Sequence, residues 1–509
     1  MPAASEVVQH ADGRVELANP EELESSPLYN HDLAPVAVKD RTWNTWDYSA
    51  LWISMAHCIP TYTLASGMIA AGMAWWQALA AIVIGNLIVL APILLNSHPG
   101  TKYGIPFPVY ARAAYGTAGA NVPAILRALV ACGWFGINAW IGGAALQTFF
   151  NALWPGWHGV LGASLFDWSF DGTDRLLHLG SIDLKYHLLL PFANTQWIAF
   201  ALFWGLNILV IFRGMDLLRR VERFAAPYVL VMTAVLVYWA IDRAGGLGPL
   251  LERTSFEGKG SVWDVFIPSL TGTIAFWSTL SLNMPDFTRF GRSQKEQVVG
   301  QAIALPTTMT LFAAMAIAIT SATALIYGKP IFDPIELAGK FSSKLIVAIA
   351  MFTAVVATLA VNIAANVVSP ANDFANAFPK RINFRRGGVI TGVIGILMMP
   401  WELLANADRY INGWLGGYGA ALGSVAGVLI VDYWVIRGRE LDLAALYTPS
   451  GTYYYRGGWN LAAVGATVAG FGIALLGAFW PPMRPIYHWS WFVGFGLSGG
   501  LYWVLMRRS

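Results

Sequence analysis

Long apolar segments recur along almost the whole chain and constrain its fold more than any other feature. A helix needs about 20 apolar residues to cross the hydrocarbon core of a membrane, and only 12% of this chain is Asp, Glu, Lys or Arg. The candidate spans are 46–72, 75–97, 119–151, 194–212, 224–241, 262–286, 297–327, 342–366, 387–403, 411–435, 459–479 and 488–506. Their residues do not alternate between apolar and polar, as barrel strands would. The sequence therefore predicts an all-α integral membrane protein with 12 transmembrane helices.

The segment that precedes the first span differs in composition from the rest. Residues 1–44 contain eight acidic and three basic side chains, and no basic stretch precedes an apolar run as in a signal peptide. We expect a disordered cytoplasmic tail there. Lys and Arg concentrate in the loops on the side of this tail, which predicts a multi-pass plasma (inner) membrane protein with both termini cytoplasmic. The net charge of +3 and the absence of a basic stripe exclude nucleic acid as a partner.

Two spans contain residues that weaken a helix near mid-depth. Pro60 interrupts the first span, and small and hydroxylated residues around Gly272 loosen the sixth. In transporters, broken helices at matching positions of two repeats mark the binding site. The alternative is a proline kink and a small-residue packing face.

The offset of five spans between these breaks predicts an internal repeat. We expect a first five-helix repeat at 45–241 and a second, inverted one at 262–435. A cytoplasmic loop at 436–458 and two additional C-terminal helices at 459–509 would complete the chain.

Aromatic and amide side chains gather at mid-span positions. A flat, uncharged heterocycle can stack on indoles, and its N–H and C=O groups can pair with amides. The alternative is that the amides bond between helices and the indoles fill volume. The residues concerned are Trp134, Asn138, Phe276, Trp277, Asn362 and Asn366.

The patterns expected of other classes of protein are missing from the sequence. The histidines form no HExxH motif, and no Walker motif occurs. We therefore expect no enzyme, no resident metal and no cofactor.

The chain contains the motifs NHDLAPV (30–36), GTKYGIPFPVYARAAYG (100–116), GWFGINAWIGG (133–143), NMPDFTRF (283–290), NIAANVVSPAND (362–373) and VDYWVIRGRELDLAALY (431–447). These motifs resemble the nucleobase:cation symporter family, which contains cytosine, uracil, thiamine, allantoin and hydantoin permeases. The similarity is greatest to its uracil/allantoin subgroup and runs from about residue 30 to the C-terminus.

The resemblance implies the leucine-transporter-like five-plus-five inverted repeat with two further helices, and a substrate site between spans 1, 3, 6 and 8. Trp134 and Trp277 would sandwich the substrate ring, and Asn366 would bond its edge. Asn138 stands where hydantoin and allantoin members usually have Gln. Cys58 occupies a position in the first break that is polar in the hydantoin transporter.

The resemblance also places a cation site, and here the chain departs from the sodium-coupled hydantoin member. The positions are Ser54, His57, Ala357, Ala360 and Val361. Two hydroxyl ligands of that member are replaced by Ala360 and Val361, so we expect proton-coupled or ion-independent transport rather than sodium symport. His57 is a candidate proton carrier because the ordinary pKa of histidine is about 6.5. The alternative for His57 is a structural hydrogen bond within the helix break.

These observations predict a symporter that imports a neutral planar heterocycle such as uracil, allantoin or hydantoin. Its partners would be that substrate, a coupling proton and the bilayer, and we expect a monomer. One alternative is an amino-acid or amine carrier of the same fold, although no mid-span carboxylate stands beside Trp134 or Trp277 to bind an amine. A multispan membrane sensor is the alternative from another class, but it would need a soluble domain that is not visible in the sequence.

Overall fold

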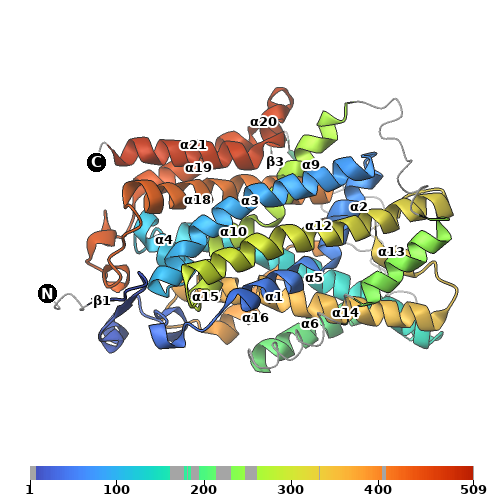
Figure 1. The fold of residues 1–509 in the computed structure, drawn as a ribbon, viewed down its shortest axis with the longest axis horizontal. Helices are drawn as coiled ribbons and strands as arrows, with labels where there is room; N and C mark the ends of the chain where they lie inside the picture. The colour runs from blue at the N-terminus through green and yellow to red at the C-terminus, as the bar shows by residue number, and fades with distance from the viewer. Residues whose placement is uncertain are drawn as a thin grey trace.

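The computed structural model describes residues 7–160, 177–179, 182–184, 194–213, 228, 231–246, 261–331, 333–403 and 409–507. The described chain forms a bundle of long helices, and both of its ends lie at the same end of the bundle (Figure 1). Seven described helices are long and apolar enough to cross a membrane: Trp75–Tyr103, Asn121–Leu153, Thr195–Arg213, Gln294–Tyr327, Lys344–Ala377, Tyr410–Ile436 and Leu461–Phe479. The all-α membrane architecture predicted from the sequence is thus present.

Four further predicted spans are helices that are shorter or broken. They comprise α1 (Thr45–Ala56) with α2 (Ile59–Ala70), α9 (Trp263–Phe276) with α10 (Ser278–Asn283) and α11 (Pro285–Thr288), α16 (Phe384–Leu397) with α17 (Pro400–Leu403), and α21 (Ser490–Met506). The predicted span 224–241 lies partly outside the described residues, and residues 231–243 of this region are helical.

The first break lies where the sequence predicts it. Asn44 caps α1 by accepting hydrogen bonds from the N–H groups of Trp46 and Asp47. The helix ends at His57, Cys58 is extended, and α2 begins at once with Pro60 in its first turn. Proline is tolerated there because the first N–H groups of a helix have no intrahelical acceptor.

The second break lies later than the sequence predicts. Helix α9 runs through Gly272 without interruption and ends at Trp277, whose φ of −99° and ψ of 3° are not helical. The hydroxyls of Thr273 and Ser278 donate to carbonyls four residues earlier in the chain. These side chains thereby remain compatible with a helix. The helix is therefore interrupted at an aromatic residue of the predicted site.

The predicted eighth span continues beyond residue 366. Helix α14 (Lys344–Asn366) is followed, after a kink at Val367, by α15 (Val368–Ala377). The polar residues of α15 contact protein groups rather than solvent: Ser369 bonds Asp286, and Asn376 bonds Arg112. Polarity in this stretch therefore does not end the helix.

The remaining described elements connect and complete the bundle. The long helices are α3 (Trp75–Tyr103), α5 (Asn121–Leu153), α6 (Asn194–Arg213), α12 (Gln294–Tyr327), α18 (Gly416–Ile430) and α19 (Leu461–Phe479). Two π-helical segments, η5 (Arg409–Leu415) and η6 (Val431–Ile436), flank α18. The short helices include α4 (Phe107–Tyr115), α13 (Pro334–Ala338) and α20 (Arg484–His488). Two short antiparallel pairs complete the set: β1 (Val7–Gln9) with β2 (Val15–Leu17), and β3 (Leu177–Leu179) with β4 (Ile182–Leu184).

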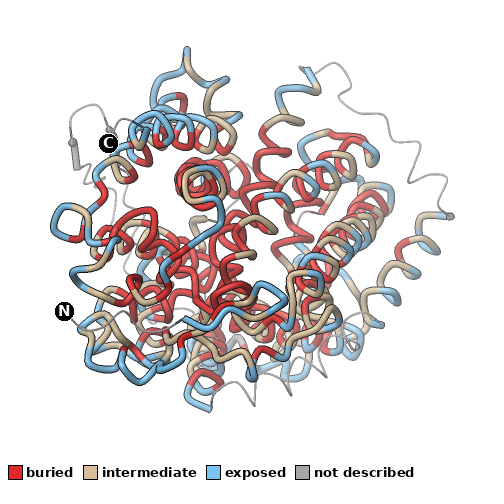
Figure 2. Tube along the Cα trace, turned by 60° about the vertical axis from the view of Figure 1, so that its left-hand side comes forward, coloured by how far each residue is buried: buried red, intermediate tan, exposed pale blue. Residues whose placement is uncertain are grey.

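Helix α5 occupies the interior of the bundle. It packs against α14, α15, α16 and α6, and buried residues fill this central region in Figure 2. Gly136 of α5 lies directly against Gly395 of α16, where an added Cβ would come 2.2 Å from the Gly395 carbonyl oxygen. Small residues at such contacts let membrane helices approach closely.

The expectation of a disordered N-terminal tail is wrong for residues 7–44. Val15, Leu17 and Leu33 of this segment are buried. The buried guanidinium of Arg41 donates to the carbonyls of Val15, Val36, Thr101 and Lys102. Burial lowers the pKa of Arg41 to about 10, so the group stays charged at neutral pH. The prediction rested on the acidic composition of the segment and overlooked the few apolar residues and the one cation that attach it to the bundle.

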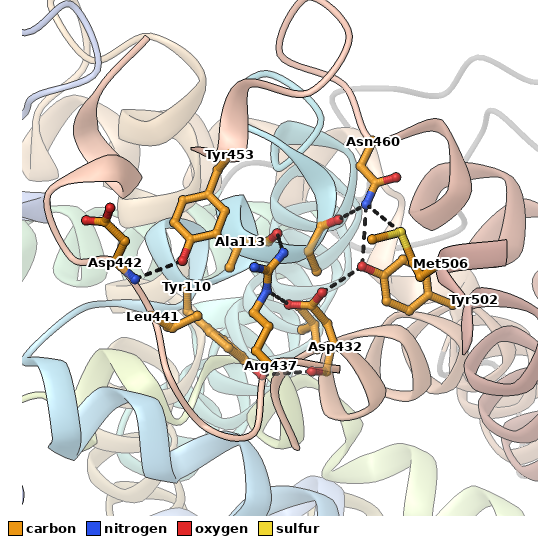
Figure 3. Close-up of polar contacts among 12 residues, drawn as sticks. Tyr110, Ala113, Asp432, Arg437, Leu441, Asp442, Tyr453, Asn460, Tyr502 and Met506 are labelled. Atoms are coloured by element: carbon orange, nitrogen blue, oxygen red, sulfur yellow. Dashed lines mark hydrogen bonds and ion pairs between the residues drawn. The ribbon is translucent and has the colours of Figure 1, made fainter. Parts of the chain in front are cut away.

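A buried polar cluster joins the C-terminal helices to the end of the bundle (Figure 3). Asp432 of η6 accepts hydrogen bonds from Arg437 Nε and from the Tyr502 hydroxyl of α21, each at 2.7 Å. Arg437 Nη2 donates to the carbonyl of Ala113 in α4 at 2.8 Å and to the Tyr455 hydroxyl at 2.5 Å. One carboxylate and one guanidinium thus connect η6, α4, α21 and the loop that precedes α19.

Candidate functional site

All six residues predicted to bind substrate line one cavity. They come from the break between α1 and α2, from α5, from the break between α9 and α10, and from the end of α14. The residues are Cys58, Trp134, Asn138, Phe276, Trp277 and Asn366. The cavity has a volume of about 30 Å³, which is space for about one water molecule.

Aromatic side chains close the cavity. The ring of Phe276 lies 5.2 Å from Trp134 and 4.8 Å from Trp277, in edge-to-face contact with both indoles. Trp277 in turn contacts Trp52 of α1 at 5.0 Å. These rings already make the contacts that a bound ring would make, so a heterocycle can enter only when they move apart.

Two buried polar atoms at the cavity have no hydrogen-bond partner among the residues that the structure describes. Asn138 donates from Nδ2 to the carbonyl of Trp134 at 3.0 Å, which leaves its Oδ1 unpaired. The indole N–H of Trp277 is also unpaired. The first is an acceptor and the second a donor. Buried polar groups of this kind are costly unless a partner satisfies them.

A chain of amides holds Asn366 in place. Asn366 Nδ2 donates to Asn362 Oδ1 at 3.0 Å, and Asn362 Nδ2 donates to Asn207 Oδ1 at 3.1 Å. Asn207 completes the chain by donating to the carbonyl of Phe203 within α6. Asn362 therefore has the helix-bridging role that the sequence left as its alternative, while Asn366 at the end of the chain borders the cavity.

The positions assigned to a cation site do not line one common cavity. Val361 borders the substrate cavity, whereas His57 and Ala357 border a second, largely apolar cavity of about 130 Å³ between α2, α12 and α14. Ser54 and Ala360 line neither of these cavities. Within the described residues, no group of three or more His, Cys, Asp or Glu could hold a metal ion.

His57 and Cys58 form local contacts at the first helix break. His57 Nδ1 bonds the carbonyl of Ile53 at 3.0 Å, and its ring lies 4.7 Å from Phe312. The Cys58 thiol pairs with the Thr61 hydroxyl at 3.2 Å. The contact of His57 is the structural hydrogen bond that the sequence left open as its alternative role.

Sequence reasoning missed an aromatic wall behind Trp134. The indole N–H of Trp134 donates to the Tyr418 hydroxyl at 3.2 Å, and Tyr410 and Trp414 also contact its ring. These residues come from η5 and α18, in a span rich in Gly and Ala that carried no signal of a site. Further lining residues not predicted are Met55, Pro60, Thr279, Leu280 and Ala365.

A larger cavity of about 660 Å³, here called the vestibule, lies between the N-terminal segment and the bundle. Its walls include Asp32 and Trp43 of the N-terminal segment, Leu51 of α1, Asp286 of α11 and Asn372 of α15. Helices α1 and α14 border both spaces, α1 through Met55 and Leu51 and α14 through Asn366 and Ala364.

Comparisons with known proteins agree with this architecture. A family described as permeases for cytosine/purines, uracil, thiamine and allantoin matches residues 35–170 and 181–494. The allantoin permease of Bacillus subtilis is 41% identical over 485 residues, covering 95% of this chain and 94% of that protein. The purine-uracil permease NCS1 of Arabidopsis thaliana is 40% identical, covering 94% and 78% respectively. The closed structure of Mhp1, a nucleobase-cation-symport-1 family transporter with bromovinylhydantoin bound, has a TM-score of 0.74 at 23% identity and covers 94% of this chain and 96% of that one.

Proposed function

This chain belongs to the family of permeases for cytosine/purines, uracil, thiamine and allantoin, and from that premise we propose that it imports a neutral planar heterocycle such as uracil, allantoin or hydantoin. It is a membrane transporter and not an enzyme. In the proposed mechanism the substrate site opens alternately to the two sides of the plasma membrane, with both termini cytoplasmic and the monomer as the working unit.

The composition of the substrate cavity is the observation that carries the proposal. Its walls include the aromatic rings of Trp134, Phe276 and Trp277 and contain no charged side chain. They hold one unpaired acceptor, Asn138 Oδ1, and one unpaired donor, Trp277 Nε1. A ring that carries both N–H and C=O groups can satisfy both atoms while it stacks on the indoles. Asn366, oriented by Asn362, supplies a further amide for the edge of that ring.

The same composition disfavours a carrier of amino acids or amines. A charged ligand would need a counter-charge or a bare helix end in the cavity. The lining side chains are neutral, so an ammonium or carboxylate group would find amides, an indole N–H, a hydroxyl and a thiol as side-chain partners, but no counter-charge. A zwitterion could still bind at the helix breaks. In that case amino acids would compete with the heterocycle for uptake.

We also propose that the substrate moves together with a proton. Ala360 and Val361 have no side-chain oxygen for a sodium ion, and small hard cations require several oxygen ligands. The sequence offers His57 as a candidate carrier, and the bond from its Nδ1 to the carbonyl of Ile53 supports the structural alternative for this residue.

Replacement of Trp134 tests stacking in the cavity. Trp134→Ala should weaken binding of radiolabelled uracil or allantoin by roughly 1–3 kcal/mol, the magnitude found when aromatic side chains that stack on bases are removed. Equilibrium binding to the purified protein in detergent measures this loss. Trp154→Ala, at an exposed position beyond the end of α5, is the matched control and should bind like the wild type. Equal affinity of Trp134→Ala and the wild type would contradict the stacking role.

A further inference from the structure

A pair of opposite charges, deeply buried, joins α5 to α15. Arg127 Nη1 lies 3.9 Å from Asp373 Oδ2, and both side chains are fully buried. Neither carboxylate oxygen of Asp373 has a hydrogen-bond donor within the described part of the chain, and Arg127 Nε and Nη1 have no acceptor there. A buried ion pair offsets the loss of hydration only with close geometry and additional hydrogen bonds. The negative charge of an ionised Asp373 is therefore poorly stabilised by its surroundings.

A second acid lies beside this pair and is far better satisfied. Asp286 of α11 accepts hydrogen bonds from the Ser369 hydroxyl at 2.5 Å and from the N–H of Phe107 at 3.0 Å. Ser369 and Asp373 are four residues apart on α15 and share one face of that helix. Two carboxyl groups in one buried site do not both ionise readily. Since Asp286 holds the donors, Asp373 is the acid that takes a proton at lower cost.

The pair lies between the substrate cavity and the vestibule. Arg127 Nη2 reaches the carbonyl of Ala365 at 3.5 Å, and Ala365 lines the substrate cavity. On the other side, Asp286 and Asn372 line the vestibule. Asp373 thus adjoins Asn372, which lines the vestibule, and the charge partner of Asp373 contacts the wall of the substrate cavity.

Other charged groups near α15 have partners of their own. Arg112 bonds Asn376 and the carbonyl of Leu446, and Asp32 accepts from the N–H of Phe384. The elements that pack against α15 are α4, α5, α14, α16 and the segment His31–Leu33, and α11 is bonded to it through Asp286. Their charged or titratable residues are Arg127 and Cys132 (α5), Tyr110, Arg112 and Tyr115 (α4), Asp286 (α11), Lys344 (α14), Arg385 and Arg386 (α16), and His31 and Asp32 (His31–Leu33). Among them, Arg127 is the group that forms an ion pair with Asp373.

We propose that Asp373 takes up and releases the coupling proton, and that Arg127 links its state to the substrate cavity. Uptake converts the Asp373 carboxylate to a carboxyl group and removes the charge that holds Arg127. Release toward the vestibule restores the ion pair. This inference rests on the proposed proton-coupled transport and specifies the residue that performs it.

The test uses purified protein in proteoliposomes with radiolabelled allantoin or uracil and sodium-free buffer. Two rates are measured: substrate exchange at equal pH, which needs no net proton movement, and accumulation driven by an inwardly directed proton gradient. The wild type should show both. Asp373→Asn should keep exchange, lose gradient-driven accumulation and lose the pH dependence of exchange. Asp373→Glu, which keeps an acid, should restore accumulation, and His57→Gln should retain both activities.

The outcomes separate this inference from the proposed function. A wild type that exchanges substrate but does not respond to a proton gradient contradicts proton coupling itself. Gradient-driven accumulation by Asp373→Asn, with the wild type also coupled, overturns only the role of Asp373. If that variant does not reach the membrane, the neutral double variant Arg127→Gln, Asp373→Asn is judged by the same two rates. Loss of accumulation with intact exchange in His57→Gln would also overturn the proposal.

Discussion

Asn366→Ala should abolish most uptake of the transported heterocycle while the protein still reaches the membrane. The substitution removes the amide that borders the substrate cavity at the end of the chain Asn207–Asn362–Asn366. A substrate group left without its hydrogen bond in a buried site costs about 1–3 kcal/mol, which corresponds to a loss of about 5- to 150-fold in uptake at low substrate concentration. Initial rates in cells, normalised to the amount of protein in the membrane, measure the effect.

Asn86→Ala is the matched control for this experiment. Asn86 is a buried amide of α3 that donates to the carbonyl of Ile82 in its own helix, and it does not line the substrate cavity. Its replacement should leave uptake close to that of the wild type. Wild-type uptake by Asn366→Ala would refute the assignment of the site, and an equal loss in both variants would assign the effect to folding.

Asp432→Ala should strongly destabilise the protein. Removal of the carboxylate leaves the Arg437 guanidinium, which is 15% exposed, with only the Ala113 carbonyl and the Tyr455 hydroxyl as acceptors (Figure 3). Breaking a buried ion pair by removing one partner costs about 3–5 kcal/mol. Since this carboxylate also accepts from Tyr502, α21 should loosen from the bundle. Thermal unfolding of the purified protein in detergent measures the drop in melting temperature.

Two companion variants show whether the buried pair causes this loss. Tyr502→Phe removes one hydrogen bond and should cost about 1 kcal/mol. Lys329→Ala breaks an exposed ion pair with Glu336, at 3.4 Å, and should change the melting temperature little. A melting temperature of Asp432→Ala as high as that of Lys329→Ala would show that the cluster does not hold the C-terminal helices.

The sequence selected residues that line one cavity, but it did not predict the geometry of that cavity. Spacing and resemblance were enough to select Trp134, Trp277 and Asn366, because helical periodicity and a proline break determine which residues of one helix face inward. They could not reveal that Phe276 touches both indoles and closes the cavity. That contact depends on the helix break at Trp277, and the sequence has no proline or glycine at that position that would predict a break.

Contacts between segments far apart in the chain were beyond sequence reasoning. Arg127 falls inside a predicted span, but its partner Asp373 lies beyond the end of the predicted span 342–366. The N-terminal segment had the composition of a disordered tail, yet Arg41 attaches it to the carbonyls of Thr101 and Lys102. In both cases a single buried cation contacts a segment far away in the chain, and composition averaged over a window cannot detect such a contact.

Competition uptake tests the central claim most directly. The assay uses proteoliposomes in sodium-free buffer with an inwardly directed proton gradient. Radiolabelled uracil, allantoin, hydantoin, cytosine or adenine is the transported substrate. The unlabelled forms of the other rings, amino acids and amines are added as competitors. We predict that at least one of uracil, allantoin and hydantoin accumulates and that only neutral planar rings compete with it. Accumulation of an amino acid or an amine without competition by any heterocycle, or a strict requirement for sodium, would contradict this account.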